Sequence, residues 1–191
     1  LAALGHRVTA VDVDAGRVKS LREGIVPIYE PGLSELVKKQ VAEERLFVDT
    51  DTAKATHEAS TIFIAVGTPP AKGGGYDFSY LFAAAENIAK AAAGPKTIVI
   101  KSTVTPGTGS RIAALVEKLS PKKIEVMNNP ESLRGGTAVQ DFMQPDRVVF
   151  GAASPQGIAT LREIYQPLID RGYAIYAMSR ESAELTKFAA N

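Results

Sequence analysis

Short runs rich in β-branched residues alternate with longer amphipathic segments along most of the chain. Such runs are typical of strands buried on both faces, whereas the longer segments carry the 3.6-residue period of helices. We expect strands over residues 7–13, 46–48, 61–66, 97–100, 124–127, 147–150 and 173–176. We expect helices over residues 15–23, 33–44, 78–93, 108–119 and 155–169, and from about 181 to the end. This alternation predicts an α/β fold with a doubly wound, mostly parallel sheet.

The first residues and the glycines indicate which part of such a sheet is present. Gly5 stands where a helix C-cap is expected, so residues 1–4 are interpreted as the tail of a helix that precedes the first strand. No G-x-G-x-x-G motif occurs, and the glycine run at residues 73–75 is predicted to be a flexible connector. We therefore expect a Rossmann-like sheet that lacks its first strand and its glycine-rich loop.

Composition argues against several classes of partner. The 22 Lys and Arg residues nearly balance the 21 Asp and Glu residues, and no basic run is present, so we expect no nucleic-acid partner. No apolar stretch approaches the roughly 20 residues that span a bilayer, so we expect no membrane partner and a cytoplasmic location. The chain has no Cys, which rules out disulfides and thiolate zinc ligands. His6 and His57 lack partners at metal-ligand spacing, so we expect both to be solvated and no metal to bind.

Asp12 ends the first predicted strand, and Arg17 follows about one helical turn later. In a dinucleotide-binding fold, an Asp at this position accepts hydrogen bonds from the adenosine ribose hydroxyls. The alternative is that Asp12 or Asp14 only caps the next helix. The local pattern fits both interpretations equally well.

Two loops follow the carboxyl ends of predicted strands, where open parallel sheets bind their ligands. The first loop contains Thr68 and Pro69, and the second contains Ser102, Thr103 and Thr105. Both loops offer hydroxyls and backbone amides to a cofactor. The alternative for the second loop is that one of its hydroxyls caps the helix predicted to begin near residue 108.

Two further loops carry residues suited to ligand contacts. Residues 128–136 follow a predicted strand and include Glu131, which can activate a water as a general base. The alternative is a solvated ion pair between Glu131 and Arg134. Residues 25–33 combine two prolines with apolar and polar side chains, which suits a ligand contact or a rigid turn with Pro31 at the start of the next helix.

The last predicted helix places Lys187 and Asn191 four residues apart and therefore on one face. Two donors on one face can stabilise an anion that develops on a substrate. The alternative is an ordinary surface ion pair between Glu184 and Lys187.

Six segments, taken in order, resemble the UDP-glucose/GDP-mannose dehydrogenase family. They are VDVD at residues 11–14, PIYEPGL at 27–33, VGTP at 66–69, STV at 102–104, NPESLR at 129–134 and AELTKFAAN at 183–191. The resemblance covers essentially the whole chain, and PIYEPGL and NPESLR are its most distinctive segments. It implies NAD-dependent oxidation of the C6 CH2OH of a nucleotide sugar to a carboxylate, through a cysteine-bound thiohemiacetal and thioester.

The resemblance also implies roles for individual residues. The adenosine ribose would be held by Asp12 and Arg17, and the nicotinamide half of NAD would be lined by Thr68, Pro69 and Thr103. The catalytic set would be Glu131 as general base or water-orienting carboxylate, Lys187 and Asn191 as donors to the C6 oxyanion, and Thr103. Glu131, Lys187 and Asn191 would also contact the nucleotide sugar. Leu133 and Arg134 would lie along the channel that holds it.

The chain departs from the family pattern in four places. The glycine-rich loop is expected before Leu1, and the nucleophilic Cys is expected well beyond Asn191. Without that thiol no covalent acyl intermediate forms, so we expect the chain alone to make no uronic acid, and we expect it to bind NAD weakly. Ser132 replaces a usual aromatic and Gly135 replaces a common Glu, which bears on substrate packing and one cofactor contact.

The resemblance divides the chain into an NAD-binding domain, residues 1–178, and the start of a helix, residues 179–191, that leads into a second half. It implies a homodimer for the full-length protein, and we expect apolar surface in this chain to cause limited solubility or self-association. Residues 144–149 are more similar to the branch that acts on UDP-glucose than to those acting on GDP-mannose or a UDP-N-acetylhexosamine. A non-catalytic nucleotide-binding module is the alternative outside the enzyme class, and the joint presence of Glu131, Lys187 and Asn191 argues against it.

Overall fold

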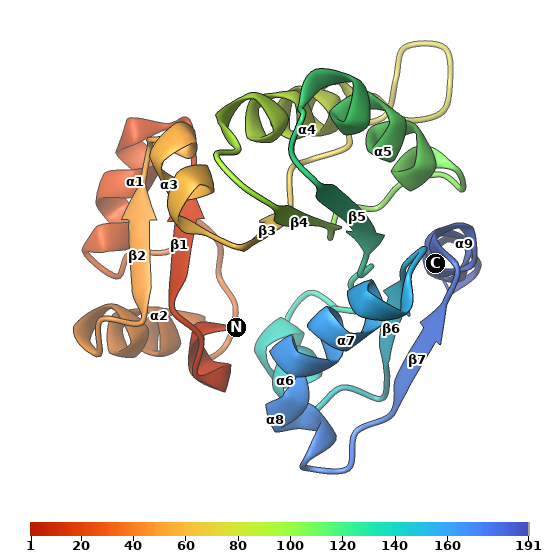
Figure 1. Ribbon diagram of the computed structural model, residues 1–191. Helices are drawn as coiled ribbons and strands as arrows, with labels where there is room; N and C mark the ends of the chain where they lie inside the picture. Colours follow the sequence, from red (N-terminus) through yellow and green to blue (C-terminus); the bar gives the residue numbers. More distant parts are fainter. Residues whose placement is uncertain (191) are drawn as a thin grey trace.

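The computed structural model describes residues 1–190, and its elements alternate between strands and helices as Figure 1 shows. Their order is η1 Ala2–Leu4, β1 Val8–Val11, α1 Ala15–Arg22, α2 Leu33–Ala42, β2 Leu46–Asp49, α3 Thr52–Glu58, β3 Thr61–Ile64, α4 Ser79–Ala91, β4 Lys96–Ile100, α5 Thr108–Leu119, β5 Ile124–Asn128, α6 Ala138–Met143, β6 Val148–Gly151, α7 Pro155–Ile164, α8 Gln166–Ile169, β7 Ile175–Met178 and α9 Arg180–Ala190. The fold is α/β, as the sequence predicts.

The strands form a two-stranded sheet with the order β1-β2 and a five-stranded sheet with the order β3-β4-β5-β6-β7. Neighbouring strands are parallel except β5 and β6, which pair antiparallel at Asn128 and Gly151. Figure 1 shows the two sheets side by side, with β1 nearer than β2 to the larger sheet. Within residues 1–190, β1 and β3 each pair on one edge only. This split agrees with a doubly wound sheet that lacks one inner strand.

Two apolar clusters lie on opposite faces of the larger sheet. One packs α4 and α5 against residues such as Ile98 and Val126. The other packs α7 and α8 against Val99 and Met127, which directly follow Ile98 and Val126 in the chain. Because successive strand residues point to opposite faces, β4 and β5 are buried on both sides, as the sequence predicts.

Two of the edge strands, β1 and β7, do not follow that prediction. In β1 the burial of successive residues alternates, and the central residues of β7 are exposed. Val13, predicted to lie in the first strand, falls beyond its end and is 91% exposed. Each of these strands pairs on one edge only, so fewer neighbouring elements cover it.

Helices also differ from the prediction at three places. The structure contains α3 and α6, which are too short to show a clear apolar period in the sequence. The single helix expected over residues 155–169 is divided at Tyr165 into α7 and α8. Pro167 explains the division, because it has no N–H with which to continue the α7 hydrogen bonds.

The chain start is a single 3-10 turn that ends at Gly5 in the left-handed region, with φ of 104°. His57 is exposed as expected, but His6 is not solvated: it is half-buried, and its Nε2 lies 2.7 Å from the carbonyl oxygen of Ile164. Within residues 1–190 no helix has the length and apolarity needed to cross a bilayer. The same residues contain no group of three or more His, Asp or Glu side chains arranged to hold a metal.

Candidate active site

The loops after β3 and β4 meet at the carboxyl edge of the larger sheet, because the two strands are parallel. Thr68 Oγ1 donates to the carbonyl oxygen of Thr103 at 3.1 Å, and Ser102 Oγ donates to that of Val66 at 2.7 Å. The predicted cofactor loops are thus tied to each other. The alternative that a hydroxyl of the second loop caps α5 is wrong, because Gly107 is the N-cap and no side chain of the loop caps the helix.

Glu131 and Lys187 form an ion pair that joins the loop after β5 to α9. Lys187 Nζ lies 2.7 Å from Glu131 Oε1, and the two side chains are 11% and 29% exposed. The other carboxylate oxygen of Glu131 accepts the N–H of Leu133 at 2.6 Å. Burial alone would raise the pKa of Glu131, but these two hydrogen bonds and the charges of Lys187 and Lys101 outweigh burial and lower it. The site therefore presents an ionised carboxylate beside an ammonium group.

The alternative pairing of Glu131 with Arg134 is wrong. Arg134 Nη2 lies 2.7 Å from Asp141 Oδ1, and its Nε and backbone N–H both donate to Asp141 Oδ2. Hydrogen bonds from Arg134 hold the pKa of Asp141 well below its usual range. Both Arg134 and Leu133 are exposed, so these two predicted substrate residues lie at the outer rim of the Glu131 loop.

Lys101 lies at the end of β4 and was not singled out by the sequence analysis. Its Nζ donates to Asn129 Oδ1 at 3.2 Å, and the same oxygen accepts the Tyr165 hydroxyl at 2.5 Å. Burial lowers the pKa of Lys101 to about 8, with Glu131 opposing and Lys187 reinforcing that shift. A charged residue directly after the apolar run at residues 97–100 is the sequence signal that could have marked it.

Glu184 has a different role from the one that the sequence suggested. The alternative of a surface ion pair between Glu184 and Lys187 is wrong, because Glu184 is 2% exposed and its carboxylate faces α5 and β5. No local pattern marks it, since its partners lie 56 to 77 residues earlier in the chain. Asn191, which we expect beside Lys187, lies outside the described residues.

Of the two acidic residues considered for capping the first helix, Asp14 makes the cap and Asp12 does not. Asp14 caps α1, with its Oδ1 accepting the N–H groups of Gly16 and Arg17 at 2.8 and 3.1 Å. Asp12 accepts the N–H of Asp14 at 2.9 Å and pairs with Arg17 Nη1 at 2.7 Å. The Asp14 N–H, and then Arg17, lower the pKa of Asp12. Asp12 is therefore an ionised, half-buried acceptor directly after β1.

Glu30, in the two-proline loop, holds that loop to the end of the Glu131 loop and to the start of α6. Its two oxygens accept the N–H groups of Gly136 at 2.9 Å and Ala138 at 3.3 Å. Gly32 is the N-cap of α2, so Pro31 lies just outside the helix rather than at its first position. The neighbouring Tyr29 is 91% exposed.

A mostly parallel sheet with an acidic acceptor after an early strand, and with polar loops and a Glu–Lys pair at its carboxyl edge, is typical of a dinucleotide-binding domain. The sequence model described as "UDP-glucose/GDP-mannose dehydrogenase family, NAD binding domain" matches residues 1–169. The chain belongs to this family, and NAD is the cofactor of this domain.

Similar proteins agree with the assignment. The chain is 41% identical to UDP-glucose 6-dehydrogenase TuaD of Bacillus subtilis, covering 100% of this chain and 41% of that protein. The structure of a UDP-glucose dehydrogenase from Pyrobaculum islandicum matches with a TM-score of 0.94 and 37% identity, covering 99% of this chain and 44% of that one. GDP-mannose dehydrogenase from Pseudomonas aeruginosa matches with a TM-score of 0.93 and 35% identity, covering 100% and 45%. The chain spans less than half the length of these relatives.

The residues present fit part of the dinucleotide. Asp12 offers an ionised oxygen to ribose hydroxyls, and the joined loops of Thr68 and Thr103 offer hydroxyls at the carboxyl edge of the sheet. The 191 residues contain no G-x-G-x-x-G turn that could bind the pyrophosphate.

Proposed function

We propose that this chain is the cofactor-binding half of a UDP-glucose 6-dehydrogenase, which oxidises the sugar C6 CH2OH to a carboxylate and makes UDP-glucuronate. The observation that carries the proposal is the partly buried Glu131–Lys187 pair on a fold that binds NAD. Relatives named as UDP-glucose dehydrogenases support the choice of sugar. The domain division at residue 178, a cytoplasmic location and a homodimer of the full-length protein belong to the same proposal.

The chemistry follows from the charges of the pair. The NAD held by the cofactor-binding residues would supply the hydride acceptor for C6. Glu131 is ionised, so it can accept a proton directly or from an oriented water. Lys187 donates to the oxygen at C6 as negative charge develops there, and Asn191 is the second donor in this scheme. Thr103, in the loop joined to Thr68, lines the reacting end of the cofactor site.

The remaining binding residues lie at two places. Asp12 and Arg17 hold the adenosine ribose, and Pro69 lies beside Thr68 against the nicotinamide half. Leu133 and Arg134 line the outer part of the nucleotide-sugar channel. Arg134 enters that channel already paired with Asp141, so it contacts the substrate through donors that Asp141 leaves free.

The chain alone is proposed to be inactive. The second oxidation in this scheme needs a thiol nucleophile, and the 191 residues contain no Cys. GDP-mannose is the second candidate substrate, because GDP-mannose dehydrogenase matches almost as well in structure as the UDP-glucose enzyme. Residues 144–149 favour UDP-glucose.

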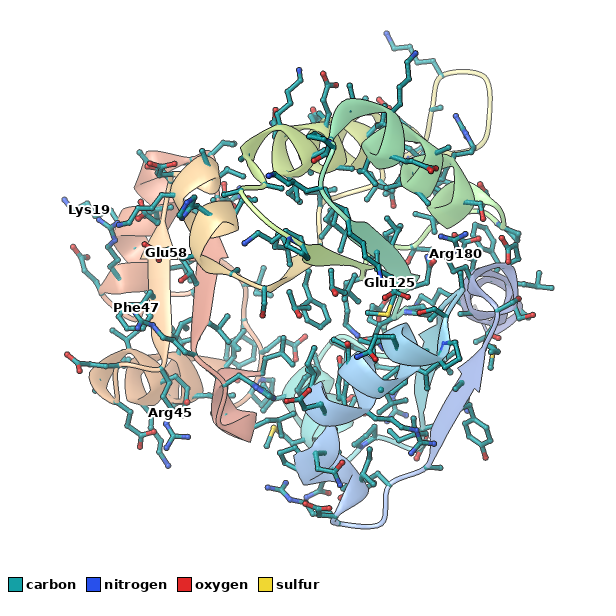
Figure 2. All side chains as sticks on the ribbon, in the orientation of Figure 1. Lys19, Arg45, Phe47, Glu58, Glu125 and Arg180 are labelled. Carbon is teal, nitrogen blue, oxygen red and sulfur yellow. The ribbon has the colours of Figure 1, made fainter. Side chains whose placement is uncertain are left out.

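The test uses the full-length protein and two substitutions in the pair. Glu131→Gln removes the base and Lys187→Ala removes the donor, so each lowers kcat with UDP-glucose by about 10²-fold or more. Initial rates of NADH formation measure the loss. Glu58→Gln, at the exposed residue labelled on α3 in Figure 2, and Lys118→Ala are the matched controls, with rates expected near wild type. Wild-type rates in both Glu131→Gln and Lys187→Ala would refute the assigned roles.

A further inference from the structure

α9 is held to the domain by a buried carboxylate three residues before Lys187. Glu184 Oε2 accepts the N–H of Gly107 and Oε1 accepts the N–H of Gly109, both at 2.6 Å. Oε1 also accepts from Asn128 Nδ2 at 3.1 Å. One side chain therefore joins α9 to the start of α5 and to the last residue of β5.

We propose that Glu184 is a positioning residue, which holds Lys187 in reach of Glu131 by fixing α9 against α5 and β5. This inference rests on the proposed function for the role of Lys187. The contacts repeat along the chain: Asn128 at the end of β5 and Glu131 in the following loop are three residues apart, and their partners Glu184 and Lys187 are three residues apart on α9. The two contacts together fix the position of α9 along its axis and its rotation about that axis.

Glu184 supplies the acceptors that the start of α5 lacks. Gly107 is the N-cap and brings no side chain, so the first N–H groups of the helix need an acceptor from another element. A carboxylate accepts from both and is favoured by the positive end of the helix dipole. A Gln at residue 184 would bring one oxygen and one NH2, and the NH2 would face a backbone donor.

α9 packs closely against the start of α5 and against β6. A Cβ on Gly109 would lie 2.5 Å from Asn128 Oδ1 and 3.0 Å from Glu184 Oε1. A Cβ on Gly151 would lie 2.6 Å from the Cβ of Ala183. At the start of the helix, Arg180 reaches β5 (Figure 2), where its Nη1 donates to the carbonyl oxygen of Val126 at 3.4 Å. The helix is therefore held close to the sheet, and Glu184 sets its contact with the active-site loops.

The test compares Glu184→Gln with Glu181→Gln in the full-length protein. Glu181 is one turn earlier on α9 and also contacts α5, with Ser110 Oγ donating to it at 2.6 Å, but it is exposed. Glu184→Gln is expected to lower kcat by about 10²-fold, because small displacements of a catalytic group are that costly. KM for UDP-glucose and for NAD+ is expected to stay within about three-fold. Glu181→Gln is expected to keep wild-type values.

Two readouts separate positioning from simple loss of folded protein. The acid limb of the kcat–pH profile is expected to move to higher pH in Glu184→Gln, because Glu131 loses the nearby ammonium that lowers its pKa. Acylation of Lys187 by an amine-reactive reagent, followed by mass spectrometry, is expected to be several-fold faster. This second readout needs no substrate, so it tests the positioning even if no nucleotide sugar is turned over.

A Glu184→Gln variant with the kcat, pH profile and Lys187 reactivity of Glu181→Gln would overturn the proposal. So would a loss of kcat that follows the fraction of folded protein and leaves the pH profile unmoved. Asn128→Ala is the second variant, for use if Glu184→Gln does not fold. It removes one donor to Glu184 and keeps the two backbone bonds, so a smaller loss of kcat with the same direction of pH shift is expected. Wild-type behaviour of Asn128→Ala would also count against the proposal.

Discussion

Lys101 shows at the scale of a single residue how burial sets charge in this site. Its ammonium lies among groups of both signs, with Glu131 and Lys187 close enough to shift its pKa. Asn129 accepts from it, and Tyr165 donates to the same oxygen. Burial dominates, so the folded chain holds this proton more weakly than the unfolded chain does.

This difference predicts a dependence of stability on pH. The pKa of Lys101 is about 8 in the fold and 10.5 in the unfolded reference, so the unfolded state binds more protons between these values. Stability therefore rises with pH across that window, by about 3 kcal/mol for this group. Urea unfolding of wild type and Lys101→Met from pH 7 to 10.5 measures it. The wild-type minus variant difference in unfolding free energy is expected to increase, and a constant difference would contradict the account.

The residues of the site differ in how far the sequence reveals them. Asp12, Thr103 and Lys187 follow from strand ends, helix periodicity and family motifs. The partner of Glu131 does not: Arg134 is near in the chain, yet Lys187, 56 residues later, makes the ion pair. Glu184 is harder still, because its role depends on contacts between elements whose packing no local pattern encodes. Charges in contact across the fold are the part that sequence periodicity leaves open.

At the scale of elements, β6 is buried most completely, and it connects the active-site loops to α7 and α9. All four of its residues are buried. Phe150 is 0% exposed and packs on Tyr165 with ring centroids 5.4 Å apart. The runs of β-branched residues predicted β3 to β6 well. The division of α7 from α8 depends on Pro167, and the short helix α3 begins at its Asp51 cap, whereas α6 is short and has no side-chain cap.

Phe150→Ala is expected to destabilise the fold by about 3 to 5 kcal/mol, because a fully buried aromatic leaves a cavity. The free energy of urea unfolding measures it. Phe47→Ala is the control: Phe47, labelled in Figure 2, is a half-buried ring on β2 with Arg7 stacked 4.6 Å from its centroid. Loss of that contact is expected to lower the free energy of unfolding by about 1 kcal/mol, and loss of the partly buried ring surface lowers it somewhat further. Equal losses in the two variants would mean that β6 is not the core of the domain.

At the scale of the whole molecule, large apolar side chains are exposed just after β1 and in the two-proline loop before α2. Val13 and Tyr29 are each 91% exposed, and Ile28 is 61% exposed. Exposed apolar groups of this kind favour contacts with another protein surface. The chain is therefore expected to self-associate as its concentration rises, with light scattering as the measurement and Val13→Ser with Tyr29→Ser expected to reduce it. A stable monomer at high concentration would contradict this expectation.

The central claim concerns the reaction of the full-length protein. Oxidation of CH2OH to a carboxylate releases two hydrides, so about two NADH form for each sugar consumed. The most direct measurement is the ratio of NADH formed to UDP-glucose consumed at completion, with GDP-mannose in a parallel reaction. We predict a ratio of about two with UDP-glucose and no turnover of GDP-mannose. A ratio of one, turnover of GDP-mannose instead, or no NADH from either sugar would contradict the account.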